Sequence, residues 1–263
     1  MRWAARIGAP VNRLHDDYWN FRGSFKIAKL IDIGTHMSLV RRASGRFVAL
    51  DSYALDDADR GLLLEVTDGG RLVDAIINVH PFHTLHCTAL IDALPGARLI
   101  GTRRHLAQLP DLPWDQAVIE DAATQAEFAS DLEFSIPQGV DFISADEKVH
   151  VASVLVRHRA SRIVHVDDTI NVLQPPGILS AVLPEAKLRF HPMLAKALQK
   201  RSGAADDYAS WARELAQSWA DTPVVCAAHS AVRQLPPGGW ENEILGALKD
   251  VEKTLDSHRA TYG

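Results

Sequence analysis

Several features are scarce or missing in this sequence of 263 residues, and each scarcity excludes a class of protein. Two cysteines, Cys87 and Cys226, are too few for a disulfide framework, and we expect both to be buried as small hydrophobic side chains. No apolar run approaches the length of a membrane span, and residues 1–20 have no apolar segment of the kind found in secretion signals. We therefore expect a soluble protein of the cytoplasm that does not bind membranes.

An excess of positive charge is also missing. The net charge of −5 at pH 7 argues against broad binding to nucleic acids, although the pairs Arg41-Arg42 and Arg103-Arg104 could form local basic patches. With 47% hydrophobic and 23% charged residues, the composition is typical of a globular protein of enzyme size. Because no repeat, low-complexity segment or linker interrupts the chain, we predict a single domain over residues 1–263, which could form a homo-oligomer. An N-terminal extension over about residues 1–20 and a C-terminal helix over about 241–259 complete this prediction.

Strand-like and helix-like segments alternate along the chain, which is typical of an α/β protein. A turn at Ala43-Ser44-Gly45 predicts a hairpin, and Gly69-Gly70 closes a helix that has regular apolar spacing. The expected strands cover about residues 25–33, 37–42, 45–51, 72–79, 97–102, 149–156, 162–166 and 223–229. The expected helices cover about 57–66, 87–94, 103–110, 206–220 and 241–259.

Three histidines lie within seven residues in the segment HPFHTLH, which follows one predicted strand and precedes a predicted helix. Pro81 suits the first turn of a helix, because its missing N–H needs no partner there. We therefore expect His83 and His86 on one side of that turn, with His80 approaching the same point from the end of the strand. Neutral imidazole is a preferred ligand of zinc and iron. The alternative is that His80 only ends the strand, while the other two face solvent or form hydrogen bonds in the core.

Two further apolar strands also end on residues that bind metals. Asp167 and Asp168 follow the strand 162–166, and His229 ends the strand 223–229. In α/β folds the reactive groups collect at the carboxyl ends of strands. Two acids in a solvated turn would give the same local pattern. Three strand ends that each carry a ligand-type residue nevertheless favour one shared site.

This order of parts resembles the metallo-β-lactamase fold superfamily over about residues 25–235. The family has a hairpin whose second strand ends in Asp, which Asp51 matches. Its His-x-His-x-Asp-His loop is matched loosely by residues 80–86, and the histidine that follows is matched by His150. Its Gly-Asp-Thr segment is matched by Asp167-Asp168-Thr169, and its final Gly-His by Ala228-His229.

The resemblance implies an αββα sandwich, in which helices flank two mixed β-sheets. It also implies a metal site built from His80, His83, His86, His150, Asp168 and His229. The sequence departs from the family at Leu85, which stands where the family has a carboxylate for a second metal. Because leucine does not bind metal ions, we expect one ion rather than two, with zinc ahead of iron or manganese. We expect His80, His83 and His150 to hold that ion. The remaining residues, His86, Asp168 and His229, form a weakened second site or support the ligands from outside.

The activity implied by the resemblance is hydrolysis of a small-molecule ester, lactone, thioester or phosphodiester by a metal-activated water. Asp168 and Asp167 are the predicted catalytic acids, which would orient that water or accept its proton. Leu85 supports a second hypothesis, a catalytically degenerate protein of this fold that binds a ligand or a metal without turnover. A third is an interaction protein whose histidines are incidental. Residues 170–205, rich in proline, are expected to shape the substrate pocket.

Overall fold

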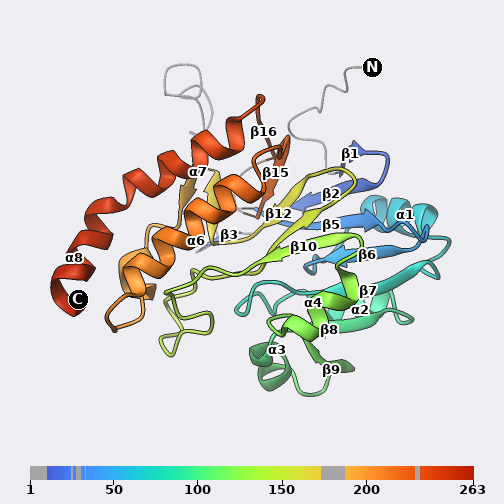
Figure 1. Ribbon diagram of the computed structural model, residues 1–263. Helices are drawn as coiled ribbons and strands as arrows, with labels where there is room; N and C mark the ends of the chain where they lie inside the picture. The colour runs from blue at the N-terminus through green and yellow to red at the C-terminus, as the bar shows by residue number, and fades with distance from the viewer. Residues whose placement is uncertain (1–10, 25, 28–30, 33, 173–186, 229–231) are drawn as a thin grey trace. The chain divides into compact units, whose positions relative to one another are not determined.

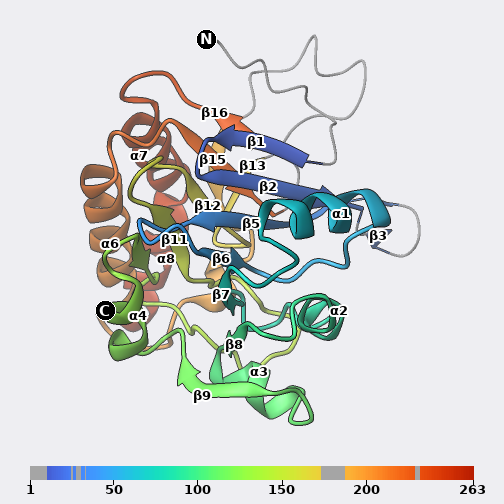
Figure 2. The same cartoon turned by 90° about the vertical axis from the view of Figure 1, so that its right-hand side faces the viewer.

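The described part of the chain contains two large mixed sheets, two short strand pairs and eight helices, which confirms the predicted α/β class (Figures 1 and 2). The chain divides into two compact units. The N-terminal unit comprises Met1–Phe134 and Arg157–Ser161, and the C-terminal unit comprises Ser135–Val156 and Arg162–Gly263. The structure is a computed structural model that describes residues 11–24, 26–27, 31–32, 34–172, 187–228 and 232–263.

A seven-stranded sheet forms the framework of the N-terminal unit, with the order β1-β2-β5-β6-β7-β8-β9 (Figure 2). From β1 to β6 the neighbours are antiparallel, and from β6 to β9 they are parallel. Parallel neighbours need a crossover connection, and helices supply it here. The strands are β1 (Val11–His15), β2 (Tyr18–Gly23), β5 (Thr35–Arg41), β6 (Phe47–Leu50), β7 (Val73–Ile77), β8 (Arg98–Gly101) and β9 (Trp114–Val118). A separate short pair consists of β3 (Lys26–Ile27) and β4 (Ile31–Asp32).

The hairpin between β5 and β6 turns where the sequence predicts it. The N–H of Arg42 donates to the carbonyl of Arg46 at 2.7 Å, and the N–H of Gly45 donates to the carbonyl of Arg42 at 2.9 Å. Gly45 adopts φ +82°, a conformation that favours glycine. The expected N-terminal extension over about residues 1–20 includes β1 and part of β2.

Helix α1 (Asp57–Val66) has the predicted bounds, because strong local signals mark both of its ends. At its start the side chain of Asp56 accepts a hydrogen bond from the N–H of Asp59 at 2.8 Å. Beyond its end, Gly69 and Gly70 both have positive φ angles. The other helices of the N-terminal unit are α2 (Cys87–Ala93), α3 (Arg103–Gln108) and α4 (Ala122–Phe128).

In the C-terminal unit, β12 (Val164–Val166) pairs in parallel with β15 (Val224–Ala227), which pairs antiparallel with β16 (Val232–Gln234). These strands belong to the second large sheet, of order β10-β11-β12-β15-β16. The chain passes from one unit to the other within β10 (Leu132–Ser135) and β11 (Leu155–His158). A further antiparallel pair consists of β13 (Ile170–Val172) and β14 (Leu188–Phe190). Of the proline-rich segment 170–205, residues 173–186 lie outside the described residues.

The helices of the C-terminal unit cover its hydrophobic core. They are α5 (Leu194–Ala197), α6 (Ala204–Ser218), α7 (Gly239–Asp250) and α8 (Glu252–Tyr262), with α6 and α7 running side by side (Figure 1). The predicted apolar stripe of α6 is buried, including Tyr208 and Trp211. The indole N–H of Trp240 on α7 donates to the carbonyl of Leu215 on α6 at 3.1 Å.

The single C-terminal helix expected over about 241–259 is two helices, α7 and α8. Val251 separates them, with φ −98° and ψ 1°. Its N–H bonds to the carbonyl of Leu248, three residues back, at 3.2 Å. This tighter turn interrupts the helical hydrogen-bond ladder without any glycine or proline that would have marked the break. None of the helices in the described ranges is long and apolar enough to cross a membrane.

Candidate functional site

The histidine loop, residues 80–86, connects the carboxyl end of β7 to helix α2. The prediction that His83 and His86 share the first helical turn is wrong, because α2 begins at Cys87. Pro81 does start a turn, which the N–H of His83 closes on the carbonyl of His80 at 3.1 Å. The turn does not continue as a helix, because the next N–H, that of Thr84, bonds within the loop to the carbonyl of Phe82. His86 is the residue that immediately precedes the helix.

The turn brings two of the predicted ligands together. The imidazole rings of His80 and His83 are stacked, with centroids 4.0 Å apart and an interplanar angle of 27°. His80 is buried and His83 is half-buried. The ring of His86 instead packs edge-on against Tyr53, with a centroid distance of 6.1 Å. Burial, together with the nearby His83, lowers the pKa of His86, so its ring is neutral at neutral pH and can bind a metal.

Asp51, the residue that follows β6, fixes the backbone just before His80. Its carboxylate accepts a hydrogen bond from the N–H of Val79 at 2.8 Å, and its own N–H donates to the carbonyl of Ile77 at 2.8 Å. Asp51 is buried and adopts φ +61°, which aspartate and asparagine tolerate better than most residues. Asp51, which the family resemblance drew attention to, therefore has a structural role beside the histidine loop.

Helix α3 also contacts the histidine loop, through residues to which sequence reasoning gave no role. Arg104 donates to the carbonyl of Pro81 at 3.1 Å, and its guanidinium lies 4.2 Å from the centroid of the Phe82 ring. His105 is fully buried, and its Nε2 lies 3.3 Å from the carbonyl oxygen of His83. Burial lowers the pKa of His105 to about 4, so it is neutral at neutral pH. The capping-box spacing from Thr102 to His105 is the sequence signal that could have drawn attention to this helix.

Cys87 lies next to the loop but is an inert thiol. Its Sγ lies 3.6 Å from Oδ1 of Asn78 and 3.8 Å from the carbonyl oxygen of His83. Burial raises the pKa of Cys87 to about 12, which excludes a thiolate at neutral pH. Cys87 therefore packs as a small hydrophobic side chain, and both cysteines of the chain are buried thiols.

In the C-terminal unit, Asp167 and Asp168 follow β12 directly and both are buried. Oδ2 of Asp168 lies 3.2 Å from Nδ1 of His150, whose side chain is 42% exposed. A carboxylate only accepts, so Nδ1–H of His150 donates and the lone pair lies on Nε2. Metal-binding histidines commonly donate their second nitrogen to a carboxylate in this way. The structure thus pairs two of the predicted ligands within this unit.

A second contact joins the same two segments of the C-terminal unit. The N–H of Ser153 donates to Oγ1 of Thr169 at 2.8 Å, and the two hydroxyl oxygens are 2.9 Å apart. The segment carrying His150 and the segment carrying Asp168 are therefore held to each other at two points. His229, the remaining predicted ligand, lies outside the described residues.

The comparisons with known proteins bear on the fold of the chain. No family model matches the chain, and no curated protein matches its sequence. Solved structures do match it. A crystal structure of a metallo-β-lactamase from Erythrobacter litoralis, with β-mercaptoethanol in the active site, is 14% identical and has a TM-score of 0.59. That match covers 95% of this chain and 99% of that chain.

Two further solved structures match over similar lengths. A metallo-β-lactamase from Pontibacter korlensis is 12% identical, with a TM-score of 0.57 over 94% of this chain and 99% of that chain. One from Hirschia baltica is 16% identical, with a TM-score of 0.55 over 92% of this chain and 98% of that chain. The chain has the metallo-β-lactamase fold. At these identities the likeness establishes the metallo-β-lactamase fold, and the reaction has to be argued from the site.

Leu85 stands at the position of the histidine loop where the resemblance leads us to expect a carboxylate. Its side chain is 69% exposed, so the hydrophobic core does not require a leucine at this position. In each unit, the histidines and carboxylates described above are of types that bind metal ions. Imidazoles and carboxylates are the nitrogen and oxygen ligands of zinc, and the lowered pKa of His86 favours the neutral imidazole that ligation needs. The contact between Asp168 and Nδ1 of His150 leaves the lone pair of that ring on Nε2, as in many metal-binding histidines.

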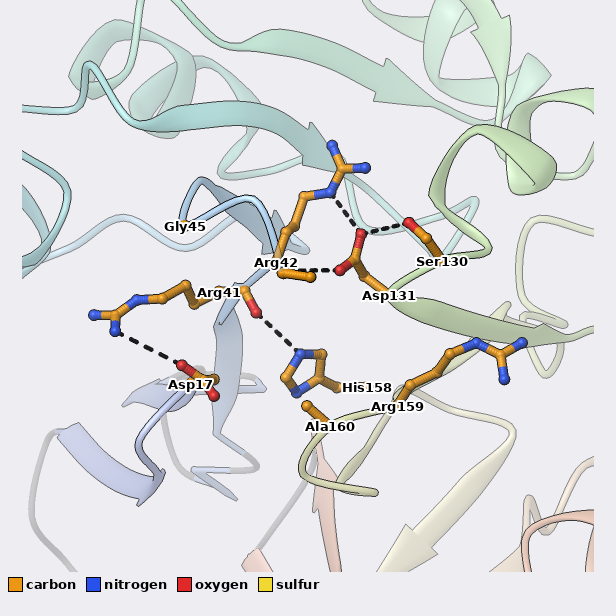
Figure 3. Close-up of a pocket in the computed structure, with 10 residues that line it drawn as sticks. Asp17, Arg41, Arg42, Gly45, Ser130, Asp131, His158, Arg159 and Ala160 are labelled. Atoms are coloured by element: carbon orange, nitrogen blue, oxygen red, sulfur yellow. Dashed lines mark hydrogen bonds and ion pairs between the residues drawn. The ribbon is translucent and has the colours of Figure 1, made fainter.

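The N-terminal unit also contains a cavity of about 520 Å³, lined by other residues, including His158 (Figure 3). Three arginines, Arg41, Arg42 and Arg159, border it, but their guanidinium groups point away from one another (Figure 3). Arg42 donates to Asp131 at 3.0 Å, and Asp131 also accepts from the N–H of Ala43 at 2.7 Å. The contacts of Asp131 with Arg42 and Ala43 stabilise the local fold.

Proposed function

We propose that this chain is a metal-dependent hydrolase of a small-molecule ester, lactone, thioester or phosphodiester. The observation that carries the proposal is the stacked pair of His80 and His83 in a loop whose backbone is held from two sides, in a chain with the metallo-β-lactamase fold. We propose one zinc ion as the cofactor, with iron or manganese as alternatives. The proposed ligands are His80, His83 and His150, assisted by His86, Asp168 and His229.

The chain's own residues supply binding, orientation and proton handling. When bound, a zinc ion would lower the pKa of a water molecule and polarise the reacting oxygen of the substrate. Asp168 accepts the hydrogen bond from Nδ1 of His150 and so fixes the tautomer and the ring orientation of that histidine. Asp167 and Asp168 are the acids that we propose to orient the water and accept its proton. We also propose a cytoplasmic location, which the two buried cysteine thiols support.

Metal content tests the proposal first. Protein without a histidine tag would be analysed for zinc, iron and manganese beside the double variant His80→Ala/His83→Ala. The matched control is His15→Ala/His258→Ala, which removes two histidines outside the proposed ligand set. We expect about one metal ion per chain in the wild type and in the control, and less than about a tenth of that in the His80/His83 variant. Metal-free wild type, even after incubation with zinc, would contradict the proposal.

Turnover tests the second half of the proposal. The metal-loaded wild type and both double variants would be assayed at pH 7.5 on one chromogenic substrate of each class: ester, lactone, thioester and phosphodiester. Hydrolysis that follows the metal content supports a hydrolase. One specific observation favours the alternative of metal or ligand binding without turnover, namely the exposed Leu85 in place of a carboxylate. A metal-loaded protein that hydrolyses none of the four classes supports that alternative.

A further inference from the structure

The contact between His105 and the carbonyl of His83 has a defined direction. Nδ1 of His105 accepts a hydrogen bond from the N–H of Thr102 at 3.1 Å, and a backbone N–H can only donate. Nδ1 therefore has no proton, and in the neutral ring the proton is on Nε2. Nε2–H then donates to the carbonyl oxygen of His83 at 3.3 Å. One histidine thus caps its own helix with one nitrogen and holds the histidine loop with the other.

The ring of His105 has little freedom to leave this position. It is fully buried, and its centroid lies 5.3 Å from that of the Trp114 ring. Gly101 makes room for it, because a Cβ at Gly101 would lie only 2.7 Å from Cβ of His105. The donor that reaches the loop is therefore preorganised before any ligand binds.

The carbonyl that His105 holds belongs to one of the two stacked histidines. Fixing the peptide plane after His83 restricts the backbone of that residue, and hence the direction in which its ring leaves the chain. Arg104 holds the preceding part of the same turn through the carbonyl of Pro81. The thiol of Cys87 also lies near the carbonyl of His83, but at 3.8 Å and with a weaker donor.

We propose that His105 is a positioning residue for the metal ion, acting through the carbonyl of His83 to hold the stacked pair of His80 and His83. This inference rests on the proposed function, because it concerns the same metal. Residues that support metal ligands from outside typically change metal affinity by about 10- to 100-fold when they are replaced.

Two substitutions test the hydrogen bonds of the two His105 nitrogens separately. His105→Gln places an amide N–H near the position of Nε2, so it keeps the donor to His83 and loses the cap. His105→Asn places an amide oxygen near the position of Nδ1, so it keeps the cap and loses the donor. The experiment measures the zinc dissociation constant of each purified protein by competition with a chromophoric chelator, with zinc alone as the probe. Thermal unfolding of the metal-free proteins is measured in parallel.

His158 provides a matched control in the same unit. It is also buried, with Nδ1 2.9 Å from Oγ of Ser161 and Nε2 3.1 Å from the carbonyl oxygen of Arg41. Its bonds hold a carbonyl outside the histidine loop. His158→Asn is therefore expected to lower the unfolding temperature, as His105→Asn does, without changing the zinc affinity.

We expect His105→Asn to weaken zinc binding by about 10-fold or more and His105→Gln to remain within about threefold of the wild type. Unchanged affinity in His105→Asn, or equal losses in His105→Asn, His105→Gln and His158→Asn, would overturn the inference. A wild type that binds no zinc would instead overturn the proposed function. The two failures are therefore distinguishable.

Discussion

At the scale of single residues, the burial of Asp59 makes the stability of the fold depend on pH. Its side chain is buried in the first turn of α1, and Oδ2 has no hydrogen-bond partner among the described residues. Burial, with the charge of Asp56 nearby, raises the pKa of Asp59 to about 6. Its pKa in the folded protein is thus above the unfolded value near 3.8, so ionisation destabilises the fold. The stability that this carboxyl contributes falls as the pH rises from about 4 through 6.

We therefore expect Asp59→Asn to become more stable, relative to the wild type, between pH 5 and pH 7.5, because asparagine has no charge to bury. Urea unfolding of both proteins at the two pH values measures the difference. Asp57→Asn is the control, since Asp57 lies on the same turn with an exposed side chain. If the free-energy difference between Asp59→Asn and the wild type is the same at both pH values, the explanation by burial is wrong.

Some residues of the candidate site could be predicted from the sequence, and others could not. His80, Asp51 and Asp168 are visible in the sequence because each follows an apolar strand. His105 is not visible in this way, because its role depends on a contact between α3 and a loop that lies 22 positions earlier in the chain. A histidine that binds a backbone carbonyl leaves no pattern in the sequence, since the partner can be any residue type.

At the scale of elements, replacing two glycines of the C-terminal unit by alanine is expected to change the stability in opposite directions. Gly139 has φ +73°, and a Cβ there would overlap the carbonyl oxygen of Ala204 at the start of α6. We expect Gly139→Ala to destabilise the protein by at least about 2 kcal/mol, through backbone strain and this overlap. Gly246 lies on the exposed face of α7 with nothing within 4 Å of a Cβ. Gly246→Ala should stabilise by about 0.5–1 kcal/mol, because alanine favours the helix.

Urea unfolding of the wild type and the two alanine variants measures the change in the free energy of unfolding at each position. Both variants carry the same substitution, glycine to alanine, so the two effects can be compared directly. Equal effects of the two substitutions would show that the tight approach at Gly139 does not constrain the fold.

Elements with strong local signals were predicted well, and those that depend on distant contacts were not. Helix α1 has its predicted bounds because a capping aspartate and two glycines mark its ends. The first turn of the histidine loop looks like a helix start in the sequence, since Pro81 and the three-residue spacing fit one. Contacts from Asp51 and from α3 hold the segment in a different turn, and these contacts are made only in the folded unit.

At the scale of the whole molecule, the order of strand ends and ligand-type residues along the chain predicted the metallo-β-lactamase fold correctly. It did so although the three solved structures described above are only 12–16% identical to this chain. Order survives because hydrophobic strands and their connections set the fold, while individual side chains can change. The division into two units could not be predicted, because β10 and β11 each cross the boundary without a break in composition.

The sheet order of the N-terminal unit has a consequence for the folding pathway. Its seven strands are neighbours in the sheet in the same order as in the chain, whereas in the C-terminal unit Val164 pairs with Val225 across a long intervening segment. Local pairings close with a smaller loss of chain entropy and form faster. In refolding monitored by pulsed hydrogen exchange, amides of β5 to β8 should acquire protection before those of β12 and β15. During synthesis on the ribosome, the N-terminal sheet could then pair most of its strands before the last third of the chain has emerged, and simultaneous protection of both sheets would contradict this order.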